Sequence, residues 1–229
     1  MPTITDEEFG VITIRRSARA TQVRLRVAPD GTLRASMPIY APIFLLKRLV
    51  KASRPQLRKM LEQSQPTASY YDGQQIGKSH TIIVREGSSL SVKHSKPHIV
   101  VTLPSTKSLG DSDVVRKIRD ANIAALRLEA KSYLPKRLQF LADKFGFQYE
   151  RVRFSHASSR WGSCSSTGTI SLNIALMKLP FEIIDYVIVH ELAHTFEMNH
   201  SQDFWALVEK GDPSYKQHRR ILKGESPTI

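Results

Sequence analysis

Residues 187–194 read Val-Ile-Val-His-Glu-Leu-Ala-His and close an apolar run that begins at Ile183. The run predicts a buried helix over residues 181–198. His190 and His194 are four positions apart and therefore share one helix face, where both imidazoles can hold the same metal ion. Glu191 is turned by about 100° from His190, which suits a carboxylate that reaches a metal-bound water rather than the metal. Ionisable side chains in a buried helix are costly unless they bind something, so this stretch predicts a metal centre.

His200 is the predicted third ligand, six residues after His194. A catalytic zinc ion has three protein ligands and one open position. The helix must end soon after His194 for His200 to turn back, and Asn199 suits that end because asparagine tolerates the left-handed conformation. We therefore predict that His190, His194 and His200 hold Zn²⁺. Zinc lowers the pKa of its bound water to about 7, and Glu191 is the predicted catalytic residue that removes the proton.

The charge of the chain is unevenly distributed. The 229 residues carry a net charge of +13. Residues 1–150 hold 25 Lys and Arg against 13 Asp and Glu, whereas residues 151–229 hold 9 against 8. The basic excess therefore lies outside the segment with the histidines, and it favours a polyanionic partner such as nucleic acid or a phosphate-bearing substrate. General solubility is the alternative explanation of this charge.

The N-terminal part of the chain is predicted to be rich in strands. Residues 22–27 and 32–37 alternate polar and apolar side chains on either side of a turn at 29–32, which indicates a hairpin. A helical pattern follows over 43–61 and is interrupted at Pro55. The chain then reads as a loop over residues 62–78 and as three strands over residues 80–85, 90–94 and 98–103.

The composition becomes helical after Pro104. Residues 114–145 predict a long helix, which Pro135 either kinks or divides into two. A strand is expected over 149–154, and a hairpin over 160–172 that turns at 166–168. The last predicted helix begins at Ser201 as N-cap and runs through Val208.

Composition also restricts the location of the protein. Cys164 is the only cysteine, so the chain has no internal disulfide and suits the reducing cytoplasm. No apolar run approaches the roughly 20 residues of a membrane span, and the acidic N-terminus does not resemble a secretory signal. We therefore expect a cytoplasmic protein without a membrane partner. Cys164 is interpreted as a small buried residue rather than a nucleophile, because free cysteine is commonly buried and no paired base is evident.

Several motifs in order resemble one protein family. The motifs that carry the resemblance are Arg160-Trp161-Gly162-Ser163-Cys164-Ser165, Ile170-Ser171-Leu172-Asn173, His190–His194, Asn199-His200-Ser201 and Phe204-Trp205. Through them the chain resembles the YgjP-like metallopeptidase family, which is related to the WLM and SprT proteases. The resemblance implies a zincin-like catalytic domain, a minimal metalloprotease, with His190, His194 and His200 as ligands and Glu191 as general base. We accordingly expect an α+β fold with a β-rich basic accessory region over 1–105 and a zincin-like metal-hydrolase domain over 106–229.

The resemblance leaves the substrate open. Members are usually labelled peptidases, some are described as pyrophosphatases that act on UTP, and the SprT and WLM relatives include proteases that act on DNA-bound proteins. The leading hypothesis is a zinc metallopeptidase acting on a peptide or protein. The alternatives are a UTP pyrophosphatase with the same metal site, a DNA-associated protease, and a nucleic-acid-binding module with a structural zinc. The last ranks lowest because a structural zinc needs four ligands.

Other residues near the motifs receive weaker interpretations. The hairpin over 160–172 could offer a free strand edge to a peptide, while Trp161 and Leu172 are expected in the core. Four polar or basic side chains near the C-terminus either stabilise an anion or are simply solvated, and we favour solvation. They are Tyr215, His218, Arg219 and Arg220. Ordinary surface or core roles are expected for His80, His94 and His98.

Overall fold

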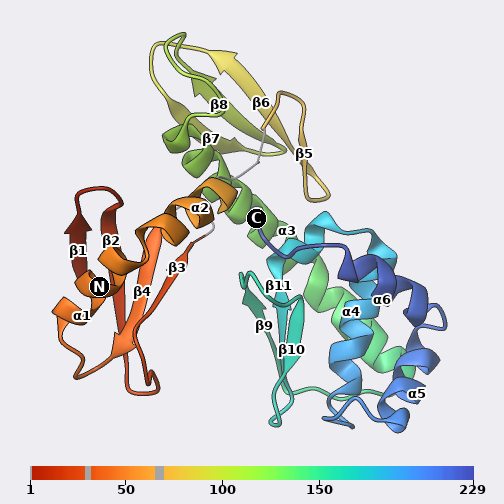
Figure 1. Ribbon diagram of the computed structural model, residues 1–229. Coiled ribbons are helices and arrows are strands. Elements are labelled where there is room, and N and C mark those ends of the chain that lie inside the picture. The colour runs from red at the N-terminus through yellow and green to blue at the C-terminus, as the bar shows by residue number, and fades with distance from the viewer. Residues whose placement is uncertain (1, 29–31, 65–69) are drawn as a thin grey trace. The chain divides into compact units, whose positions relative to one another are not determined.

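The computed structural model describes residues 2–28, 32–64 and 70–229 (Figure 1). Its contacts divide the chain into two compact units, Met1–Ser69 and Tyr70–Ile229. The mixture of sheets and helices confirms the predicted α+β class. The boundary predicted after residue 105 falls within the second unit, because strands that precede it pack against a helix that follows it.

Unit 1 contains a four-stranded sheet in the order β1-β2-β4-β3. Its strands are β1 (Thr3–Asp6), β2 (Gly10–Ser17), β3 (Arg24–Val27) and β4 (Leu33–Pro38). β2 and β4 run parallel, and the other neighbours are antiparallel. The predicted hairpin is confirmed as β3 and β4, while its turn residues 29–31 lie outside the described residues. β1 and β2 were not predicted.

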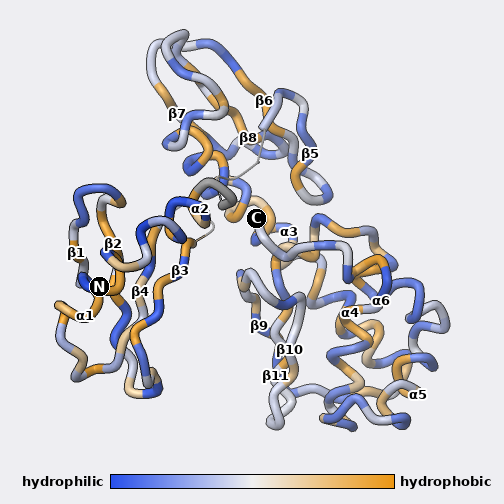
Figure 2. The backbone as a smooth tube through the Cα atoms, viewed as in Figure 1, coloured by the Kyte–Doolittle hydropathy of each residue, from blue (hydrophilic) through white to orange (hydrophobic). Residues whose placement is uncertain are grey.

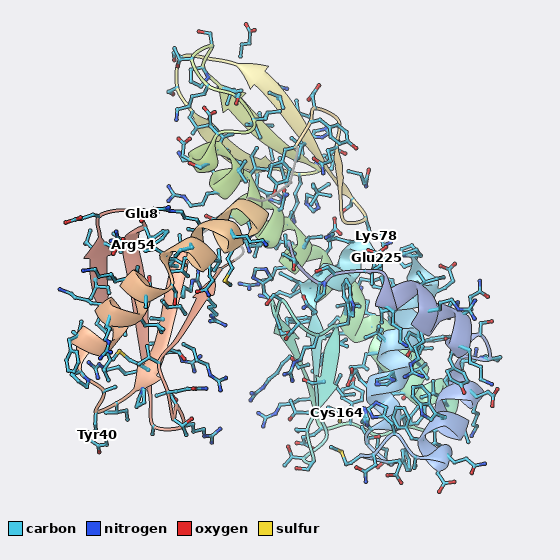
Figure 3. All side chains as sticks on the ribbon, viewed as in Figure 1. Glu8, Tyr40, Arg54, Lys78, Cys164 and Glu225 are labelled. Atoms are coloured by element: carbon cyan, nitrogen blue, oxygen red, sulfur yellow. The ribbon has the colours of Figure 1, made fainter. Side chains whose placement is uncertain are left out.

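Two helices cover one face of this sheet, α1 (Ile43–Ala52) and α2 (Arg54–Ser64). The helices are separated at Ser53, which confirms the predicted break, because Pro55 can occupy the first turn of a helix but cannot continue one. The shared core consists of Ile12, Ile14, Leu33, Ala35, Met37, Leu46, Val50 and Leu57. Arg54 of α2 also lies 3.6 Å from the Glu8 carboxylate, in the turn between β1 and β2 (Figure 3).

The second unit begins with another four-stranded sheet, in the order β5-β6-β8-β7. These strands are β5 (Gln75–Ile76), β6 (His80–Glu86), β7 (Ser91–Ser95) and β8 (His98–Leu103). The last three confirm the predicted strands. The end of α2 and the short β5 fall in the stretch 62–78 that was predicted as loop, of which residues 65–69 are outside the described residues.

A long helix, α3 (Ser112–Phe145), supports this sheet. Pro135 lies inside the helix without dividing it, and the helix ends at Gly146, which has a positive φ of 77°. Glu129 of α3 is buried and accepts hydrogen bonds from the backbone N–H groups of Lys78 at 2.7 Å and Ser79 at 2.9 Å. Nδ1 of His80 lies 2.6 Å from the same carboxylate, so this histidine is a buried core residue that joins β6 to α3.

The rest of the second unit packs around α4 (Phe181–Ala193). A three-stranded sheet in the order β10-β11-β9 is formed by β9 (Arg151–Ser155), β10 (Gly162–Cys164) and β11 (Thr169–Asn173). It leads through the short helix η1 (Ile174–Lys178) into α4, and α5 (Gln202–Gly211) and α6 (Tyr215–Lys223) follow. The hairpin of β10 and β11 was predicted and α6 was not.

None of the described helices combines the length and apolar character that a membrane crossing requires. The cytoplasmic location stays a prediction.

Candidate metal centre

The helix that carries the histidines is almost entirely buried, as its apolar sequence predicted. Ile183, Ile184, Val187, Ile188 and Leu192 are all at most 3% exposed. On the opposite side, Asp185 accepts two hydrogen bonds from the Arg137 guanidinium of α3, at 2.7 and 2.5 Å. Two parallel hydrogen bonds between a guanidinium and a carboxylate fix the orientation of the two side chains as well as their distance. α4 is therefore held by apolar packing and by an ion pair.

The helix ends at Ala193, five residues earlier than predicted. His194 is its C-cap, and Thr195 closes the end because its hydroxyl donates to the Leu192 carbonyl at 2.7 Å. Two further backbone bonds run to the Ala193 carbonyl, from Phe196 and Glu197. A left-handed Asn199 was the wrong explanation of the reversal, since no described residue other than glycine has a positive φ.

The early end of α4 brings His200 back to the other two histidines. One side-chain nitrogen from each of His190, His194 and His200 lies within 4.8 Å of the others. Nε2 of His190 and Nε2 of His200 are 3.2 Å apart. Two nitrogen ligands of a tetrahedral zinc ion lie about 3.3 Å apart, given a Zn–N bond of about 2.0–2.1 Å. The three residues predicted from the sequence thus converge at a spacing that fits a metal ion.

The protonation of these rings also suits metal binding. Burial and the neighbouring charges of His194, His200 and Arg219 lower the pKa of His190 to about 3. Burial likewise lowers the pKa of His194. Nδ1 of His194 lies 3.1 Å from the Glu197 carbonyl and donates to it, which leaves Nε2 as the acceptor that a metal requires. Neutral imidazoles with a free lone pair are the ligand form of histidine.

Phe204 of α5 is the apolar support of the three rings. Its side chain is fully buried, and its ring centroid lies 5.0, 4.5 and 4.7 Å from those of His190, His194 and His200. Ser201 caps α5 by accepting a hydrogen bond from the Phe204 N–H at 3.2 Å, which confirms the predicted N-cap. The cap therefore fixes the helix immediately after His200.

Glu191 lies on the same helix with its carboxylate against strand β10. A Cβ on Gly162 would lie 2.6 Å from Cγ and 2.7 Å from Cδ of Glu191, so only glycine leaves room for this side chain. Burial raises the pKa of Glu191 to about 8, although the positive charge of Arg160 opposes the shift. A base that is desolvated in this way holds a proton more firmly than an exposed glutamate.

Asn173 fixes the segment that leads into β10. Its buried side chain donates to the carbonyls of Ala157 at 2.7 Å and Arg160 at 2.9 Å, and accepts from the Ala175 N–H at 3.0 Å. Leu172 is fully buried, as predicted, whereas Trp161 is only partly buried.

Cys164 of β10 is half-buried (Figure 3). Burial raises the pKa of its thiol, and the nearby charge of Glu191 raises it further. A thiol with a raised pKa is a poor nucleophile at neutral pH. The expectation that Cys164 is buried is met only in part.

The C-terminal helix contributes an arginine to the surroundings of the triad. Cζ of Arg219 lies 4.7 Å from the ring centroid of Trp205, and this ring is in turn 5.9 Å from His190 and 5.7 Å from His200. Tyr215 is buried and stacks on Trp205. The favoured interpretation of a solvated basic C-terminus is therefore wrong for Tyr215, and for His218, whose Nδ1 contacts the Asp212 carboxylate at 2.7 Å.

A family model and two solved structures are similar to this chain. A family model described as the YgjP-like metallopeptidase domain matches residues 21–225. The solved metallopeptidase zymogen abylysin of Pyrococcus abyssi is 32% identical over 39% of this chain and 92% of its own, with a TM-score of 0.36. The zymogen jannalysin of Methanocaldococcus jannaschii is 18% identical over 39% of this chain and 94% of its own, with a TM-score of 0.34. No curated protein gives a significant match.

Proposed function

We propose that this chain, which belongs to the YgjP-like metallopeptidase family, is a zinc-dependent peptidase. Membership makes it a metal-dependent hydrolase and implies a divalent metal ion. Zinc as the ion, His190, His194 and His200 as its ligands, and Glu191 as the general base are the parts that we propose. The observation that carries them is the convergence of three imidazole nitrogens within 4.8 Å beside a buried carboxylate.

Zinc held by three neutral imidazoles would supply the positive charge that lowers the pKa of a water molecule and polarises a substrate carbonyl. Glu191 would accept the proton of that water at its carboxylate and pass it to the leaving nitrogen. Its burial supports this role, because a general base works best when its pKa lies near the working pH, above that of an exposed glutamate. Gly162 supports it too, by leaving the carboxylate the room that it occupies.

Strand β10 supports a peptide as the substrate. Trp161 and Ser165 make backbone hydrogen bonds to Asn173 and Thr169, so the alternation of an antiparallel pair directs the backbone groups of Gly162 and Cys164 away from β11. β10 is also the last strand of its sheet. An extended peptide can pair with such an edge through main-chain hydrogen bonds, beside the Glu191 carboxylate.

The arginines near the triad support the stabilisation of negative charge. The charge of Arg219 acts on His190, and that of Arg160 acts on Glu191. Positive groups at such positions can stabilise the oxyanion that forms when water adds to a carbonyl. The side chain of Arg219 is exposed, so it is accessible to a substrate.

The test compares zinc-loaded wild type with Glu191→Gln on casein, a peptide mixture and UTP, with bound zinc measured in each sample. We expect the variant to keep its zinc and to lose peptide cleavage by about 10²–10⁴-fold. Glu209→Gln, an exposed position of α5, is the matched control and should cleave normally. Full activity in zinc-loaded Glu191→Gln would refute the general base. UTP hydrolysis without peptide cleavage by wild type would favour the pyrophosphatase instead.

A further inference from the structure

The face of the unit 1 sheet opposite its helices is rich in arginine. Along each strand, buried core residues alternate with exposed polar ones, as the hydropathy of β2, β3 and β4 also shows (Figure 2). Every second residue therefore points away from the core. The side chains at these positions include four exposed arginines, which we call the arginine face: Arg15, Arg24, Arg26 and Arg34.

The strand register places these arginines close together. Arg26 pairs directly with Arg34 across β3 and β4. Ser36 pairs with Arg15 on one side and with Arg24 on the other. Neighbouring strands are about 4.8 Å apart, so the four guanidinium groups share a compact patch.

The rest of this face carries no negative charge among the described strand residues. Its other members are mostly small and hydroxylated: Thr3, Thr5, Val11, Thr13, Ser17, Ser36 and Pro38. The acidic side chains Asp6 and Glu8, at the end of β1, instead contact the α2 arginines Arg54 and Arg58. No Asp or Glu of the described strands therefore points to the arginine face.

We propose that the arginine face binds the phosphodiester backbone of a nucleic acid, without regard to base sequence. Arginine matches phosphate oxygens with two parallel hydrogen bonds, and serine and threonine hydroxyls are common additional donors to phosphate. The face has no aromatic side chain for stacking on bases. Among the described strand residues of this face, only Val11 and Pro38 are apolar, which is too little to enter a membrane surface. This inference concerns unit 1 alone and does not depend on the peptidase proposal.

Two triple variants of the full chain test the proposal, and each removes three positive charges. The sheet variant is Arg15→Gln, Arg24→Gln and Arg26→Gln. The helix variant changes exposed residues of α1 on the covered side: Lys47→Gln, Arg48→Gln and Lys51→Gln. Fluorescence anisotropy with labelled duplex DNA, single-stranded DNA and single-stranded RNA, over a series of salt concentrations, gives Kd and its salt dependence.

We expect wild type to bind, and the sheet variant to bind at least about tenfold more weakly at low salt. The slope of log K against log salt should decrease in magnitude by about 2–3 in the sheet variant, since each lost phosphate contact contributes about 0.9. The helix variant should change the slope by less than about one. The three probes show whether duplex or single strands are preferred.

Three outcomes would overturn the proposal. The first is an equal loss of nucleic acid affinity in the two variants, which would indicate that net charge alone drives binding. The second is no binding by wild type near physiological salt. The third is binding to anionic phospholipid vesicles but not to any nucleic acid probe. Arg26→Thr separates binding from folding. It should weaken binding without lowering Tm, because it removes the Arg26–Arg34 pair and places a β-branched residue in a strand. A lower Tm with unchanged binding would contradict the proposal.

Discussion

Gly162 and Glu191 come from different elements and lie against each other. The glycine lies on β10 and the glutamate on α4, and the space that a Cβ would take is filled by the glutamate side chain. A glycine is thus required here for close approach rather than for backbone conformation, since its φ is not positive. The position of the proposed base depends on a residue that has no chemistry of its own.

We predict that Gly162→Ala lowers kcat for peptide cleavage by about 10²-fold, because a displacement of about 1 Å in a catalytic group has an effect of this size. Bound zinc should be unchanged, since the histidines do not contact the new methyl group. Steady-state kinetics with metal analysis measures both. Gly110→Ala is the control, because its Cβ would meet only Ser108 Oγ at 3.7 Å. A normal kcat in Gly162→Ala would mean that Glu191 does not need its present position.

The residues that we propose to act directly could be recognised in the sequence, and the residues that support them could not. The spacing of His190 and His194 on an apolar helix is a local signal, and His200 follows closely in the chain. Phe204 and Gly162 act through contacts with these residues in three dimensions, which no spacing in the chain reveals. Arg219 was considered as a candidate for anion binding but was judged solvated, because its proximity to Trp205 depends on the packing of α6.

At the scale of elements, the start of α5 controls where His200 lies. Ser201 follows the proposed ligand directly and caps the helix through the Phe204 N–H. The same helix carries the phenylalanine that packs against all three histidine rings. Loss of the cap should therefore disturb the candidate metal centre in two ways, by moving the backbone at His200 and by moving the Phe204 ring.

We predict that Ser201→Ala lowers the free energy of unfolding by about 1 kcal/mol and weakens zinc binding several-fold. Ser201→Thr retains a capping hydroxyl and should stay close to wild type in both properties. Urea unfolding and competition with a chromophoric zinc chelator measure the two effects. If Ser201→Ala changes stability but leaves the zinc affinity untouched, the cap has no part in placing His200.

Element ends and long-range pairings were the features that sequence patterns could not give. The apolar pattern of α4 gave no sign that Thr195 would close the helix after Ala193. Pro135 suggested a break in α3, yet the helix continues through it and buries side chains on both sides of the proline. β2 pairs in parallel with β4, a pairing between distant segments without a turn to mark it. The local hairpins of β3 with β4 and of β10 with β11, in contrast, were predicted correctly, whereas that of β1 with β2 was missed.

At the scale of the whole molecule, Glu129 connects the first sheet of the second unit to α3. Burial alone would raise the pKa of this carboxylate, but hydrogen bonds from the Lys78 and Ser79 backbone and the contact with His80 together hold it below its ordinary value of 4.5. The folded state therefore binds fewer protons than the unfolded state in acid. The resulting stabilisation is present above the unfolded pKa and is lost as the pH falls through the folded pKa.

We predict that Glu129→Gln is less stable than wild type at neutral pH and has a flatter decline of unfolding free energy below about pH 4.5. Urea unfolding at several pH values is the measurement. Glu86→Gln, an exposed position on the same sheet, should decline as steeply as wild type. Parallel curves for Glu129→Gln and wild type would show that this carboxylate does not titrate abnormally.

The two compact units predict where the chain can be divided. A fragment of residues 70–229 should fold and bind one zinc ion, because its sheets and α3 pack together. A fragment of residues 106–229, the domain predicted from the sequence, lacks the strands that cover α3 and leaves Glu129 without its partners. We expect it to aggregate or to melt at a lower temperature. Circular dichroism and zinc analysis distinguish the fragments. Equal Tm values for the two fragments would support a domain boundary after residue 105.

We propose above all that His190, His194 and His200 form one metal site. The most direct measurement is the stoichiometry of zinc by titration of metal-free protein, for wild type and for His200→Ala, with His98→Ala as a histidine control from the first sheet of the second unit. We predict one tightly bound zinc ion per chain in wild type and in the control. We predict zinc binding that is at least about tenfold weaker in His200→Ala. Wild type that binds no zinc, or His200→Ala that binds it as tightly as wild type, would contradict the account.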